Sequence, residues 1–273
     1  MTFPIIGIIA DEIVRTSFTQ NADQLGIGIN FIQKETSTEK IIELSKNCDF
    51  LCVDPTCVPT SSLRSIEKSG ALIYPLISTI ESLEKIEKHE TSEQTLSILV
   101  TRSPHGQIST WPITLITDNL SITPAPAISE EQASEIQLAA IKLVSEIRLI
   151  GGVELIVDAN DFRKLISINW TNPSSGYAFD LGSTTNYFEQ YLRSVLDLPL
   201  GDTHNLNSFI VSGNLNTDPK SDDYRPYLHL MARNPKLKFN QSIKKVGIIG
   251  NNLDYLLTEI IHAQQYYSGE IEE

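Results

Sequence analysis

The sequence predicts an α/β protein that begins with a parallel sheet. In residues 1–86, four short apolar stretches alternate with helical segments, which is the rhythm of strands joined by crossover helices. After the polar stretch 87–93, the pattern changes to hairpin-forming strands and two amphipathic helices. From residue 206, short strands return before a final helix. These changes divide the chain into three expected domains: 1–86, 94–205 and 206–273.

Apolar runs and helix caps define the elements of the first part. Its expected strands are 3–10, 27–32, 50–53 and 71–74. The unbroken apolar run of the first is typical of a strand covered on both faces. Thr36 and Ser78 each precede a Glu by three residues, a spacing that predicts helix starts. Gly70 suits the left-handed position after a helix that ends near residue 69.

The middle part is expected to contain two hairpins and two helices. Turn residues at 103–106 separate the strand-like segments 95–101 and 107–111. Ser129 and Gln132 predict the start of a long helix, which we expect to end at Gly151-Gly152. The second hairpin pairs 152–157 with 164–169, and a helix over 184–196 follows. The remaining expected elements are strands 209–215, 227–231 and 246–249, an acidic loop at 216–226, and a helix from 253 to about 267.

Composition argues against several classes of function. Lys plus Arg is 21 and Asp plus Glu is 34, so the net charge is 21 − 34 = −13. Such a surplus repels phosphate backbones and anionic lipids, so we expect no nucleic-acid or membrane partner. No apolar run approaches the ~18–20 residues of a membrane span. The start has no signal-peptide pattern, and Cys48, Cys52 and Cys57 lack zinc-site spacing. A cytoplasmic protein is expected.

A series of segments between 152 and 201 carries a family resemblance. It consists of the strand 152–157, the turn 158–161, the segment 164–173, Phe-Glu-Gln at 188–190 and Leu-Pro-Leu-Gly at 198–201. The series resembles the carboxy-terminal half of 5-(carboxyamino)imidazole ribonucleotide synthase, an ATP-grasp family of purine biosynthesis. The likeness extends, less evenly, over nearly the whole chain.

The resemblance implies a site for Mg-ATP. In the family, a Glu on the first hairpin strand and a carboxylate after an Asn on the second strand hold the magnesium. Glu154 matches the first and Asn169 matches the Asn, but Trp170 stands in the other carboxylate's place. Glu154 is thus the candidate catalytic residue and magnesium ligand, with Asn169 beside the cofactor. The alternative interpretations are a solvent-facing strand residue for Glu154 and a turn-forming residue for Asn169. Trp170 is expected to be a core residue.

The resemblance also implies a fold for each domain. Residues 1–86 are expected to form a Rossmann-like pre-ATP-grasp domain, and 94–205 a partial ATP-grasp α+β domain. Residues 206–273 would form a small β-rich, hybrid-like domain. Between Leu83 and Gln94 the family inserts a clamp subdomain, where this chain has a short polar link. We therefore expect the central clamp to be missing.

Several other single positions either match the family or differ from it. Lys244 and Lys245 lie where the family has an Arg-Lys pair near the substrate phosphate; lysines on a solvated strand edge are the alternative. Asp11 and Glu12 replace a glycine-rich phosphate loop. We expect these two acids to stabilise a helix start. Asp54 remains where the family has carboxylates that contact the substrate.

Three hypotheses follow from these matches and departures. The first is a diverged pseudoenzyme without a required cofactor, with a structural or regulatory role as a homodimer or beside an intact paralogue. The second is an active ligase that uses ATP and magnesium to carboxylate aminoimidazole ribonucleotide with bicarbonate. The third is a module that binds a nucleotide or sugar phosphate without turnover.

Overall fold

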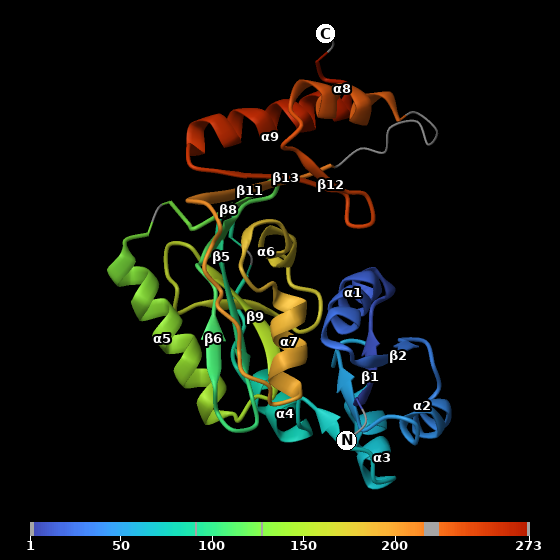
Figure 1. Cartoon of the computed structure of the whole chain (residues 1–273). Coiled ribbons are helices and arrows are strands. Elements are labelled where there is room, and N and C mark those ends of the chain that lie inside the picture. The colour runs from blue at the N-terminus through green and yellow to red at the C-terminus, as the bar shows by residue number, and fades with distance from the viewer. Residues whose placement is uncertain (1–2, 91, 127, 216–223, 272–273) are drawn as a thin grey trace.

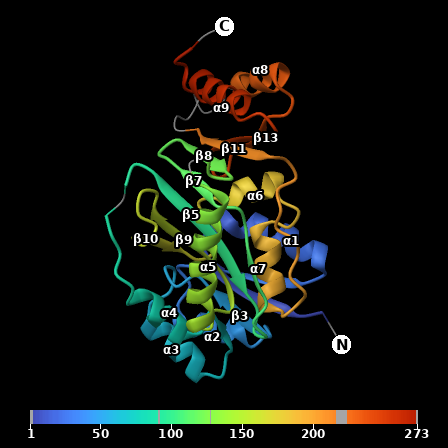
Figure 2. The same cartoon turned by 90° about the vertical axis from the view of Figure 1, so that its left-hand side faces the viewer.

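A computed structural model describes residues 3–90, 92–126, 128–215 and 224–271. These residues form two sheets: a four-stranded parallel sheet in the N-terminal part and a nine-stranded sheet in the rest of the chain (Figures 1 and 2). The predicted α/β class is confirmed. Within the described ranges, no helix combines the length and apolar character that a membrane crossing requires.

The first sheet has the strand order β2-β1-β3-β4, with every pair parallel. Its strands are β1 (Ile5–Ala10), β2 (Gly28–Gln33), β3 (Phe50–Val53) and β4 (Ile73–Tyr74). The helices around it are η1 (Glu12–Val14), α1 (Arg15–Leu25), α2 (Thr38–Ser45), α3 (Thr60–Lys68) and α4 (Ile77–Glu84). All four predicted strands are therefore present, and Gly70 has the expected positive φ of 96°.

The second sheet has the order β10-β9-β5-β7-β8-β11-β13-β12, with β6 pairing to β5. Its strands are β5 (Thr95–Arg102), β6 (Ile108–Thr110), β7 (Thr114–Ile116), β8 (Leu120–Thr123), β9 (Gly151–Asp158), β10 (Leu165–Asn169), β11 (Phe209–Asn214), β12 (Lys238–Asn240) and β13 (Lys245–Gly250). Both predicted hairpins are confirmed, as β5–β6 and β9–β10. Because β11 pairs with β8, the C-terminal strands extend the central sheet.

Helices cover both faces of the central strands. They are α5 (Glu130–Glu146), α6 (Gly176–Gly182), α7 (Tyr187–Val195), α8 (Arg225–Arg233) and α9 (Leu253–Ser268). Figure 1 shows α5 and α7 on opposite sides of β5 and β9. Alternating residues of β5 accordingly join two cores: Ile98 belongs with α5, and Leu99 with α7. Helix α1 docks on α7 through Phe18, whose ring lies 5.0 Å from that of Phe188.

The helix caps differ in part from those predicted. Ser129 and Gln132 form the expected capping box of α5. The cap predicted at Thr36 is wrong, because the Ser37 hydroxyl accepts the hydrogen bond from the backbone of Lys40 instead. The cap predicted at Ser78 is also wrong, because α4 already begins at Ile77 and has no side-chain cap. A Ser or Thr three residues before a Glu is thus only a weak indicator of the helix register.

The strand predicted at 227–231 is a helix. It forms α8, which has Pro226 in its first turn, where the missing proline N–H costs no helical hydrogen bond. Leu230 is fully buried, while Leu228 and Met231 are exposed. The apolar residues of this segment therefore cover the helix on several sides, which removed the periodicity that distinguishes helix from strand. Most of the loop predicted at 216–226 lies outside the described residues.

Two further differences concern the residues before and after the second hairpin. Helix α5 ends at Glu146 rather than at the double glycine, and Arg148 turns the chain with a φ of 54°. Gly151 instead opens β9. The short helix α6 was not predicted, and the helix expected over 184–196 is α7, which begins three residues later, after its cap Asn186.

Candidate functional site

Glu154 lies in the middle of β9, the second strand from one edge of the second sheet, and is fully buried. Oε1 accepts hydrogen bonds from Ser97 Oγ at 2.6 Å and from the Ser175 backbone N and Oγ at 2.9 and 2.7 Å. Oε2 accepts from Asn169 Nδ2 at 2.6 Å and from the Ser174 backbone N at 2.7 Å. The solvent-facing interpretation of Glu154 is therefore wrong. Five donors surround this carboxylate.

The strand pairing explains why these groups meet. β9 lies between β5 and β10, and Asn169 is opposite Glu154 in the β9–β10 register. Ser97 projects from β5 to the same face of the sheet. The loop after β10 then folds back, so that the N–H groups of Ser174 and Ser175 point at the carboxylate just before α6 begins.

Trp170 is a buried core residue, as predicted, with 7% of its surface exposed. It follows β10 directly and belongs to the core that α5 covers. Its backbone carbonyl accepts a hydrogen bond from the Tyr187 hydroxyl of α7. The indole presents no oxygen to the space beside Glu154.

Asp54 connects the first sheet to this region. Its Oδ2 accepts hydrogen bonds from the Thr171 hydroxyl at 2.6 Å and from the Thr171 backbone N at 3.3 Å. Its Oδ1 accepts from the backbone N and hydroxyl of Thr56, at 2.9 and 2.6 Å. Both carboxylate oxygens are thus already bound within the protein.

The acids after β1 have the helix-capping role that we expected. Asp11 accepts a hydrogen bond from the backbone N of Ile13 and so caps η1. Its carboxylate also forms a 2.9 Å ion pair with Lys34, and this hydrogen bond lowers the pKa of Asp11. Glu12 pairs with Arg15 at 2.9 Å. A phosphate-binding loop at this position would need backbone N–H groups that are free to bind the phosphate. Here the carboxylates of Asp11 and Glu12 lie in that place.

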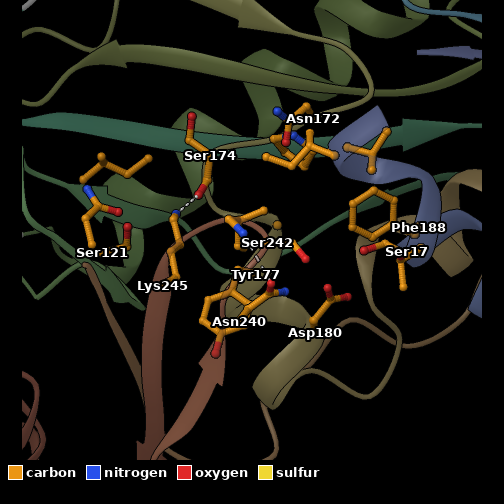
Figure 3. Close-up of a pocket in the computed structure, with 18 of the residues that line it drawn as sticks. Ser17, Ser121, Asn172, Ser174, Tyr177, Asp180, Phe188, Asn240, Ser242 and Lys245 are labelled. Carbon is orange, nitrogen blue, oxygen red and sulfur yellow. Dashed lines mark hydrogen bonds between the residues drawn. The ribbon is translucent and has the colours of Figure 1, made fainter. Parts of the chain in front are cut away.

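A cavity of about 610 Å³ lies where the N-terminal helix α1, the segment around α6 and the strands β12 and β13 come together (Figure 3). This volume is within the range of small-molecule sites. Its wall is rich in hydroxyl and amide groups. They include Ser17, Asn172, Ser174, Asn240 and Ser242.

Lys245 lies in the wall of this cavity. Its ammonium donates a 2.7 Å hydrogen bond to the carbonyl oxygen of Ser174, the residue whose N–H binds Glu154 (Figure 3). Burial lowers the pKa of Lys245, and the attraction of Glu154 opposes this effect. Lys244 is an exposed residue with a φ of 50°, and it does not line the cavity. Hydrogen bonds through Ser174 therefore link Lys245 to Glu154 and Asn169, whereas Lys244 lies outside the cavity wall.

Comparison with known sequences and structures shows which proteins this chain resembles. No family model matches it. The N5-carboxyaminoimidazole ribonucleotide synthase of Mycobacterium bovis is 36% identical over 162 residues, covering 55% of this chain and 37% of the relative. The corresponding Bacillus subtilis enzyme is 37% identical over 117 residues, covering 40% of this chain and 30% of the relative. These matches span 37% and 30% of the relatives' length, about one third.

Solved structures of such synthases share the fold. The Thermotoga maritima structure has a TM-score of 0.79 at 18% identity, covering 97% of this chain and 98% of that one. The Aspergillus clavatus structure, in complex with ADP and 5-aminoimidazole ribonucleotide, has a TM-score of 0.81 at 14% identity, covering 98% and 99%. This chain is similar in sequence to part of the N5-carboxyaminoimidazole ribonucleotide synthases and shares their fold. The resemblance predicted from the sequence is confirmed.

Because nucleotides bind in solved synthase structures, we tested the residues around Glu154 for a magnesium site. Magnesium requires several oxygen ligands with free lone pairs in near-octahedral geometry. The Glu154 oxygens instead face N–H and O–H donors, whose positive ends repel a cation. Among the described residues, no cluster of three or more His, Cys, Asp or Glu side chains could hold a metal ion. This set of groups does not fit magnesium.

Sequence reasoning missed the residues that fill the space beside Glu154. Ser97 was one polar residue in an apolar strand, and such interruptions are the available signal for a buried hydrogen-bond partner. Ser174 acts through its backbone N–H, and Ser175 through both its backbone N–H and its hydroxyl; no side-chain pattern reveals the backbone donors. Asn172, Asp180 and Asn240 gave no signal, because only the fold brings them to one cavity.

Proposed function

We propose that this chain is a non-catalytic relative of the synthases with a structural or regulatory role. The observation that carries the proposal is the saturated carboxylate of Glu154. To ligate a metal ion, Glu154 would have to give up buried hydrogen bonds to Ser97, Asn169 and the 174–175 backbone. Hydrogen bonds to a charged group contribute about 1.5–3 kcal/mol each. Trp170 supplies no replacement ligand.

The short link after α4 supports the same proposal. Helix α4 ends at Glu84 and β5 begins at Thr95. The intervening link is far shorter than the ~50 residues of a small domain. His89 holds this link to β10 by donating its backbone N–H to the Leu165 carbonyl at 2.8 Å. We infer that the clamp subdomain of the ATP-grasp fold is missing here.

The test is an assay of ADP release. The protein is given Mg-ATP, bicarbonate and aminoimidazole ribonucleotide, with the Bacillus subtilis synthase as the positive control. We expect no ADP above the rate of a protein-free mixture, because phosphoryl transfer depends on a bound metal ion to neutralise charge. ADP release that disappears in Glu154→Gln would contradict the proposal and support an active ligase.

A structural role implies a protein partner, and we retain the homodimer and the intact paralogue as the expected ones. Light scattering after size-exclusion chromatography distinguishes them. A mass of twice 30.4 kDa for the isolated chain indicates the homodimer. A monomer that shifts to a larger complex only when the paralogue is added indicates the second.

The cavity favours a second candidate function, binding of a small molecule without turnover. It combines a suitable volume with polar groups contributed by α1, the 172–174 loop and the β12–β13 turn. This function is compatible with a regulatory role, because an occupied cavity would connect segments that are distant in the sequence.

A further inference from the structure

The charges of the cavity wall point to the kind of molecule it accepts. Its described charged residues are Asp118, Asp180 and Lys245, two acids and one base. Synthase-like binding of a phosphate would require free cationic or N–H donors directed into the space. Among the described residues of the wall, Lys245 is the one cationic side chain.

Lys245 can offer only part of its ammonium group to a phosphate, because one of its three N–H donors is already used. Its ammonium already donates to the Ser174 carbonyl, and the attraction of the buried Glu154 acts on it as well. Burial lowers the pKa of Lys245, which shows that the protein around it disfavours a strongly solvated charge. Lys245 therefore holds the 174–175 loop through Ser174, and part of its charge is balanced by the nearby Glu154.

The acidic residues act against an anionic ligand. Asp118 lies in the turn between β7 and β8, and Asp180 lies on α6 with its side chain accessible from the cavity. Desolvation raises the pKa of Asp180 to about 7, so it is ionised above neutral pH. A phosphate that approached either ionised carboxylate would meet like charge, which disfavours its binding.

The uncharged groups of the wall suit hydroxyl-bearing ligands. The amides of Asn172 and Asn240 each present donors and an acceptor, and the hydroxyls of Ser17 and Ser242 can do either. Pairs of such groups match the neighbouring hydroxyls of a sugar ring, which also donate and accept. Figure 3 shows these side chains lining the same space.

We propose that the cavity binds an uncharged, hydroxyl-rich small molecule, a nucleoside or a free sugar, and excludes its phosphorylated form. The proposal rests on the second candidate function, binding without turnover, and names its ligand class. It is independent of whether ATP chemistry occurs, because the ADP assay reads a different property.

Calorimetric titration at pH 8 with matched pairs of probes tests the proposal. The pairs are adenosine and AMP, uridine and UMP, and ribose and ribose 5-phosphate, each differing by the phosphate alone. We expect the unphosphorylated member of at least one pair to bind, with a Kd at least about tenfold lower than its partner's. Binding of nucleosides but not ribose identifies the nucleoside class, and ribose binding identifies the free sugar.

A double variant, Asp118→Asn with Asp180→Asn, tests the role of charge. It should improve binding of the phosphorylated member at least about fivefold, while binding of the uncharged member changes little. Asp23→Asn is the matched control, since Asp23 is an exposed acid of α1 outside the cavity wall. The proposal is overturned if the phosphorylated members bind more tightly to the wild-type protein, or if none of the six probes binds. ADP release in the separate assay would contradict only the non-catalytic proposal.

Discussion

Glu154 holds three segments together from one carboxylate. Its donors lie on β5, at the end of β10 and at the turn that leads into α6. These hydrogen bonds replace the water that the carboxylate loses on burial. The same arrangement makes the side chain intolerant of substitution.

Glu154→Gln should therefore destabilise the protein. The new amide group would direct its N–H atoms at donors such as Asn169 Nδ2 or the Ser174 N–H. We expect a loss of about 3 kcal/mol in the free energy of unfolding. Urea denaturation measures it, and Glu135→Gln on the exposed face of α5 is the control, expected to change stability by less than about 0.5 kcal/mol. Equal stability of the two variants would show that the network contributes nothing.

For single residues, the sequence predicted where Glu154, Asn169 and Trp170 lie in the fold, but not which groups surround Glu154. The hairpin that carries Glu154 and Asn169 followed from alternating apolar residues and a turn, and the burial of Trp170 from its size. The surroundings of Glu154 did not follow, because its partners Ser97 and Ser175 lie 57 and 21 residues away. Hydrogen bonds across such separations depend on the sheet register, which short patterns do not determine.

Helix α6 packs closely against the second sheet at two glycines. A Cβ built at Gly247 of β13 would lie 2.2 Å from Leu181 Cδ1, and one at Gly182 would lie 2.8 Å from Ile210 Cγ1. The glycines thus allow the helix to approach β11 and β13 directly. This approach also positions Tyr177 and Asp180 in the cavity wall.

Gly247→Ala should force α6 away from the sheet. Overpacking of this kind commonly costs about 1–3 kcal/mol, and we expect a loss of stability in that range on urea denaturation. Gly250→Ala is the control on the same strand, because an added Cβ there would lie 3.1 Å from its nearest neighbour, Leu256 Cδ2, rather than 2.2 Å. A Gly247 variant no less stable than the Gly250 variant would show that α6 can shift without cost.

Element prediction succeeded where one periodicity dominated. The apolar strands of the first sheet and the capped helix α5 gave clear patterns. Helix α8 did not, because its apolar residues include both the buried Leu230 and the exposed Leu228. Helix α6 was missed because it is one short segment with glycine at both ends, a composition typical of loops.

For the whole molecule, a few contacts fix the first sheet against the second. Asp54 bonds to Thr171, Asn186 donates to Asn21 at 3.0 Å, and Phe18 packs against α7. The polar pairs are directional and therefore define one orientation. The cavity beside α1 depends on that orientation.

Thr171→Val should loosen this connection. It removes the hydroxyl that donates to Asp54 but preserves the side-chain shape, and leaves a buried acceptor with fewer partners. We expect a loss of about 1–3 kcal/mol and separation of the calorimetric unfolding curve into two transitions. Thr19→Val, at an exposed position on α1, is the control. One unchanged transition in both variants would mean that the two sheets are coupled by other contacts.

The three domains predicted from the sequence remain a prediction, but the structure adds a relationship that no local pattern contains. β8 and β11 are adjacent in the sheet although residues 124–208 separate them in the chain. Changes in composition along the sequence indicate where one predicted domain ends and the next begins. They do not indicate which strands will pair.

The pairing of β8 with β11 affects the chain while it is being made. Synthesis releases β7 and β8 from the ribosome long before β11, so β8 is left for a time with an unsatisfied row of backbone N–H and C=O groups. A nascent chain in that condition can pair with a neighbouring polypeptide, and a chaperone that shields exposed strands would protect it. Productive folding of the central sheet therefore waits for residues near 214 to emerge.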